Sequence, residues 1–201
     1  SNVSHPRGVG MSESILERLS RPLTPWELDQ TALRMAMHEL QIHGQDAEYG
    51  QWLQLTETLL DAGAELEPRN AWDSPLLLAA WCGSPELVDR VLGMGADAAY
   101  LGAGGETAIE ALVRGASLWG KSKKGLDLEA ALAKLYFPIA DRLIASRPSR
   151  EAKLAYIADQ KLLLLALADK KGYALARRFA AELEEAEAEL SRRGPDGVGG
   201  A

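Results

Sequence analysis

The chain has 201 residues, of which 47% are hydrophobic and 25% are charged, as is ordinary for a folded domain. Its formal net charge of -7 disfavours nucleic acid as a partner, because cationic contacts to the phosphate backbone supply most of that affinity. One cysteine excludes an intramolecular disulfide, and no apolar run approaches the ~18 residues of a membrane-spanning helix. Residues 1–10 also lack the apolar core of a secretory signal. We therefore expect a soluble, cytoplasmic protein with no cofactor, no bound metal and no membrane partner.

Alanine and leucine dominate the composition and aromatic residues make up only 6%, which favours close-packed helices over a β-sandwich. No segment keeps the alternation of apolar and polar residues that a half-buried strand needs. The predicted fold class is therefore all-α. We expect a disordered leader with a short helix over 1–22, one folded domain over 23–192 and a disordered, glycine-rich tail over 193–201.

In chain order, the first long helix is expected to begin after Thr24, a capping residue followed by Pro25, and to end at Gly44. Helical spacing of apolar residues returns over 52–60 and stops at Gly63.

The clearest signals lie over 74–95, where two short helices are expected. Ser74 and proline open the first helix, and Gly83 breaks it. Ser84 and a second proline open the next helix, which ends at Gly93 to Gly95.

Later segments also have helical patterns. Residues 107–113 predict a helix, whereas 115–126 are rich in glycine, serine and lysine and predict a loop. A helix over 128–144 should be kinked or divided near Pro138. The last two helices are expected over 154–168 and 173–190, and a run of glutamates should form the solvent-exposed face of the second.

Several segments recur with a period near 33 residues, one of them across an insertion of about 19 residues. The matching segments are 63–64 with 95–96, 74–76 with 107–109, 31–33 with 107–109, 87–92 with 139–144, and 77–79 with 164–166. A helical unit of this size cannot bury its apolar face alone, so repetition predicts a stack of units.

The unit over 72–97 resembles the ankyrin repeat. The residues that carry the resemblance are Ser74, Pro75, Leu76, Leu78, Ala79, Ala80, Gly83, Leu87, Val88, Leu92, Gly95, Ala96 and Asp97. Weaker copies lie over 29–64, 105–147 and 159–190. The resemblance implies an ankyrin-like helical repeat solenoid of about four helix–turn–helix repeats, with inserts in repeats one and three.

Ankyrin-like arrays usually bind partners through their turn tips and the exposed side of their first helices. The resemblance therefore implies a partner-binding site, without catalytic residues, at Asn70, Trp72, Asp73, Trp81, Cys82, Tyr100, Glu106, Arg114, Trp119 and Lys121. Trp81 is either an interface anchor or a residue packed against a neighbouring insert. The lysine-rich segment around Trp119 either engages an acidic partner or is a solvated loop.

The expected function is that of a non-catalytic protein–protein interaction module, monomeric in isolation, such as a bacterial immunity or regulatory protein that binds and blocks a partner toxin or enzyme. The net charge of -7 would suit a basic partner. The alternative is a small-molecule-binding protein or enzyme with a pocket that the inserts build around His43, Tyr49, Trp119 and Lys121. The sequence contains no nucleophile–base pair and no metal-binding histidine spacing, which favours the first hypothesis.

Overall fold

The computed structural model describes residues 33, 36–40, 49–67, 74–102, 104–122, 128–171 and 174–193. Regular structure in these residues is entirely helical, which confirms the predicted all-α class. The labelled helices are α3 (Tyr49–Asp61), α4 (Pro75–Cys82), α5 (Pro85–Gly93), α6 (Ala108–Ser122), α7 (Leu128–Ala131), the π-helical turn η1 (Leu132–Tyr136), α8 (Phe137–Ala145), α9 (Arg150–Lys171) and α10 (Ala174–Arg192). The leader over 1–22, residues 194–201 of the predicted tail, and most of the first long helix lie outside the described residues.

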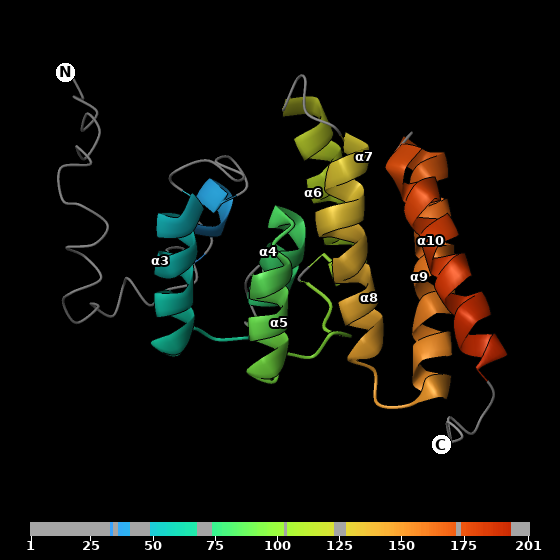
Figure 1. Ribbon diagram of the computed structural model, residues 1–201, viewed down its shortest axis with the longest axis horizontal. Helices are drawn as coiled ribbons and strands as arrows, with labels where there is room; N and C mark the ends of the chain where they lie inside the picture. The colour runs from blue at the N-terminus through green and yellow to red at the C-terminus, as the bar shows by residue number, and fades with distance from the viewer. Residues whose placement is uncertain are drawn as a thin grey trace.

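The helices follow one another along the long axis of the molecule, from α3 at one end to α10 at the other (Figure 1). From α4 onward they pack in two rows, with α4, α6 and α9 in one and α5, α8 and α10 in the other. Each helix of the first row also packs against its partner in the second, as α4 with α5 and α9 with α10. An ion pair between Arg90 of α5 and Asp61 at the end of α3 joins α3 to the second row.

Local capping explains why α4 and α5 begin and end where they do. The Ser74 hydroxyl accepts a hydrogen bond from the Leu77 N–H at 3.2 Å, and the Ser84 hydroxyl accepts one from the Leu87 N–H at 3.4 Å. Proline occupies the first turn of both helices, where its missing N–H is not needed. Gly83 ends α4 with a positive φ of 70°, which glycine adopts without steric cost. The predicted pair of short helices is confirmed.

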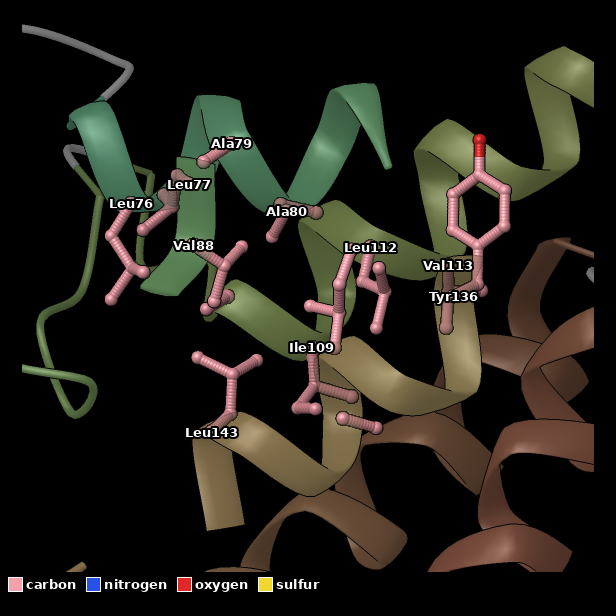
Figure 2. Close-up of a cluster of buried hydrophobic side chains, with 14 of the residues drawn as sticks. Leu76, Leu77, Ala79, Ala80, Val88, Ile109, Leu112, Val113, Tyr136 and Leu143 are labelled. Atoms are coloured by element: carbon pink, nitrogen blue, oxygen red, sulfur yellow. The ribbon is translucent and has the colours of Figure 1, made fainter. Parts of the chain in front are cut away.

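The core is one contiguous set of apolar side chains that runs through both rows. Figure 2 shows its centre, where side chains of α4 meet those of α5, α6, η1 and α8. Ala79 and Ala80 are completely buried, and their small side chains let α6 pack closely on α4.

The predicted loop over 115–126 is wrong over 115–122, because α6 continues to Ser122. The helix begins with a capping box. The Thr107 hydroxyl accepts a hydrogen bond from the Glu110 N–H at 3.2 Å, and the Glu110 carboxylate accepts one from the Thr107 N–H at 2.9 Å. The extra residues of this unit therefore lengthen a helix, and Trp119 lies on that helix.

Gly115 does not interrupt α6, although glycine lowers helix propensity. It is buried where α6 crosses α4, and an ideal Cβ on it would lie 1.8 Å from the carbonyl oxygen of Trp81. The close approach of two helices, and not a turn, therefore explains this glycine.

The expected division near Pro138 takes the form of the π-helical turn η1 between α7 and α8. In a regular α-helix the proline ring would clash with the carbonyl of Lys134 and would leave that carbonyl without its donor. A wider π turn over the preceding residues accommodates both effects without ending the helix. It also places the buried Tyr136 ring directly over the backbone of Gly83.

The last two helices are longer than expected but lie where the pattern predicts. In α10, Phe179 and Leu183 are buried and Glu184 and Glu185 are exposed, which confirms the predicted faces of this helix.

Candidate interaction surface

The predicted partner-binding residues are spread over several elements. Asn70, Trp72 and Asp73 lie outside the described residues, and so do the side chains of Trp119 and Lys121. The structure describes the other side chains, those of Trp81, Cys82, Tyr100, Glu106 and Arg114.

Trp81 lies at the C-terminal end of α4 and is half-buried. Its ring stacks on the exposed ring of His38, with 5.8 Å between the ring centroids and 21° between the ring planes. Its carbonyl oxygen faces Gly115 of α6. Trp81 therefore adjoins the preceding helical segment through its ring and the following helix through its backbone.

His38, Trp81 and Arg114 occupy matching positions along the chain. Each lies seven residues after one of the segment starts that the sequence comparison aligns, at positions 31, 74 and 107. Arg114 adjoins Gly115, and its side chain is 46% exposed. We call these three residues the 38–81–114 row.

Sequence reasoning missed His38 as a site residue. Trp81 and Arg114 lie seven residues after the aligned starts at 74 and 107, and the same count from position 31 would have identified His38. The signal was therefore present, but it depended on an alignment of weak copies of the repeat.

Arg114 is held by an ion pair, in which its Nη2 donates to Oε2 of Glu106 at 2.7 Å. The structure thus brings together two of the predicted site residues that lie eight positions apart. Leu118, one turn further along α6, is 45% exposed and adds an apolar side chain near this pair. Tyr100 is half-buried and packs against the core, so its ring supports the turn between α5 and α6.

Cys82 is poorly suited to nucleophilic chemistry. Its thiol donates a hydrogen bond to the carbonyl of Ala79 at 3.4 Å. Burial raises the pKa of the Cys82 thiol to about 12, so the reactive thiolate is scarce at neutral pH.

The side chains next to Cys82 form a structural hydrogen-bond chain. The Tyr49 hydroxyl donates to the Ser84 hydroxyl at 3.2 Å, and the Ser84 hydroxyl donates to the Glu86 carboxylate at 3.2 Å. Burial is the main cause of the raised pKa of Tyr49, so this phenol stays protonated at neutral pH. Because Ser84 also caps α5, the chain joins α3 to the α4–α5 turn.

The alternative pocket required four residues to converge. His43 and the side chains of Trp119 and Lys121 lie outside the described residues. The fourth, Tyr49, is already engaged with Ser84.

Within the described parts of the chain, no three histidine, cysteine, aspartate or glutamate side chains gather as metal ligands would. The helices described there include none with the length and apolar character needed to cross a bilayer. Comparisons with protein-family models, with curated proteins and with solved structures find no match to this chain.

Proposed function

We propose that this chain is an ankyrin-like repeat protein that binds another protein without catalysing a reaction. The observation that carries the proposal is the 38–81–114 row, in which a stacked aromatic pair and an exposed arginine stand at matching positions of successive units. Tryptophan and arginine are the residues most often responsible for binding energy at protein interfaces.

A second set of contacts supports a repeated arrangement. Arg90 and Arg142 occupy matching positions in the aligned segments 87–92 and 139–144. Arg90 pairs with Asp61 of α3, and Arg142 pairs with Asp89 of α5 at 2.7 Å. Each arginine thus pairs with an aspartate of an earlier helix, although the two aspartates do not occupy matching positions in the aligned segments.

The 38–81–114 row suggests the chemistry of the partner that would bind it. Arg114 would pair with a carboxylate, and the exposed part of Trp81 would cover an apolar side chain. The net charge of -7 would steer the rest of a basic partner towards the protein. A regulatory or immunity protein that blocks a toxin or an enzyme would use such a surface.

The test is affinity capture from extract of the source cell, with the wild type and with Trp81→Ala and Arg114→Ala as baits. Arg178→Ala is the matched control, because Arg178 is also an exposed arginine in an ion pair, with its Nη2 donating to Oε2 of Glu129 at 2.7 Å. We expect one protein to be captured by the wild type and the control and lost with the other two variants. Capture that is equal with all four baits, or no specific capture at micromolar concentration, would refute the proposal.

A further inference from the structure

The exposed face of α9 is unusually apolar. Six of its nine exposed residues between 150 and 169 are apolar, namely Ala155, Ala158, Leu162, Leu163, Leu165 and Ala166. The other three are Glu151, Asp159 and Asp169, so none is basic. We call these nine residues the α9 face.

The apolar residues form a seam along one side of the helix. Ala155, Ala158, Leu162 and Leu165 follow one another at spacings of three and four residues, as do the contact positions of a helix that packs along another helix. The seam lies opposite Ile157 and Leu164, which are completely buried. From residue 151 to residue 169 the face is about 27 Å long, enough for several turns of a second helix.

Comparison with α4 shows what is unusual about this face. The sequence aligns residues 77–79 with 164–166. Leu78 and Ala79 are 5% and 0% exposed, whereas Leu165 is 46% exposed and Ala166 is also exposed. Leu162 is 71% exposed, the largest exposed fraction among the large apolar side chains described. A terminal helix usually turns a polar face to solvent, as α10 does with Glu184, so α9 carries the residues of a covered helix.

We infer that the α9 face binds an amphipathic helix of another protein, whose apolar stripe is flanked by lysine or arginine. The acidic residues of the face argue for basic flanks. Arg177 of α10 already pairs with Asp169 at 2.9 Å, so Glu151 and Asp159 are the carboxylates that a partner would meet.

The same charges argue against two other occupants. An antiparallel second copy centred on Leu162 would set Asp159 against Leu165 of its neighbour. Lys161, the lysine beside the seam, already pairs with Glu187 at 2.7 Å. An anionic membrane surface would be repelled by Glu151 and Asp159. The inference adds a second surface to the proposed function and depends on the exposure of α9, not on the 38–81–114 row.

The direct test uses a synthetic helical peptide of about 21 residues, with leucine and alanine at the seam spacing and lysine on both flanks. A sister peptide carries glutamate in place of each lysine. Fluorescence anisotropy measures the binding of both peptides to the wild type, to Leu162→Glu and to Leu165→Glu. Leu101→Glu is the matched control, because Leu101 is 56% exposed and lies between α5 and α6.

We expect the wild type to bind the lysine peptide saturably. The affinity should fall at least about tenfold with Leu162→Glu or Leu165→Glu and should be unchanged with Leu101→Glu. Added salt should weaken this binding, and the glutamate peptide should bind less tightly than the lysine peptide. Asp159→Lys leaves the apolar seam intact but removes a carboxylate beside it. This variant should therefore reduce the difference in affinity between the lysine peptide and the glutamate peptide. Far-ultraviolet circular dichroism establishes that each variant is folded.

Three outcomes would overturn the inference. The first is no saturable binding of the lysine peptide by the wild type, and the second is equal binding of both peptides. The third is a concentration-dependent dimer of the wild type that Leu162→Glu dissociates, because a second copy would then cover the face. None of these outcomes depends on Trp81 or Arg114, so failure here is distinct from failure of the proposed function.

Discussion

Replacing Gly115 by alanine tests the close contact between α6 and α4 at this residue. The added Cβ would lie 1.8 Å from the carbonyl oxygen of Trp81, whereas carbon and oxygen atoms in contact are normally about 3.3 Å apart. Backbone of α4 blocks the methyl group, so the two helices must separate by more than ~1 Å. Such overpacking costs about 1–3 kcal/mol and more where backbone must move, and the better helix propensity of alanine offsets about 1 kcal/mol. We expect a net loss of about 2 kcal/mol in the free energy of unfolding.

The assay is thermal and denaturant unfolding followed by circular dichroism. A loss of this size should lower Tm by about 4–8 °C in a chain of this length. Gly93→Ala is the matched control, because a Cβ on this glycine of α5 meets no heavy atom within 4 Å. The control should be unchanged or slightly more stable. If Gly115→Ala were as stable as the wild type, the crossing of α4 and α6 at this residue would be wrong, and so would our reason for a glycine inside α6.

Three further substitutions test other contacts. Gly83→Ala should lose about 2 kcal/mol or more, because alanine is strained at the φ of 70° and its Cβ would lie 2.8 Å from the Tyr136 ring. Thr107→Val should lose about 2 kcal/mol, because it removes the cap of α6 and the 2.7 Å hydrogen bond to the buried Gln160. Asp141→Asn should stabilise the protein at pH 7 by less than about 1 kcal/mol, because burial, opposed by Arg142 and aided by Glu189 of α10, raises the pKa of this partly exposed carboxyl.

The pH dependence of Asp141 has a definite sign. A carboxyl whose pKa is raised in the folded state holds its proton more tightly there, so stability falls as pH rises above its ordinary value of 3.8. The gain from Asp141→Asn should therefore be present at pH 7 and should disappear below that value. A gain that grows on acidification would contradict this account. For Gly83 and Thr107, unfolding curves that overlay those of the wild type would show that the Tyr136 and Gln160 contacts are not made.

The ends of α4 and α5 could be predicted because their causes are local. Ser74 and Ser84 each bond to an N–H three residues later, and a proline follows each serine directly. Gly83 ends α4 through its own backbone conformation. A short stretch of sequence contains every group involved, so the pattern alone determines these boundaries.

Gly115 shows where local chemistry is ambiguous. A glycine among serine and lysine residues is typical of a loop, but the same residue is needed where two helices cross closely. Only the position of Trp81, in a helix far away in the sequence, distinguishes the two cases. Pro138 is similar, because its sequence indicates a break and the packing of Tyr136 on Gly83 accompanies a π turn instead.

The candidate site divides in the same way. The repeat pattern selected Trp81 and Arg114 as candidate binding residues, whereas the stacking of His38 on Trp81 joins segments far apart in the chain. The exposed leucines of α9 have the helical spacing that is typical of buried leucines. They are exposed because no helix among the described residues covers them, which the sequence pattern does not reveal. The sequence by itself thus determined where α4 and α5 begin and end and which sides of α10 are apolar, because these depend on groups within a few residues of one another. The tertiary structure decided that residues 115–122 extend α6 and that His38 meets Trp81, because these outcomes depend on contacts between distant parts of the chain.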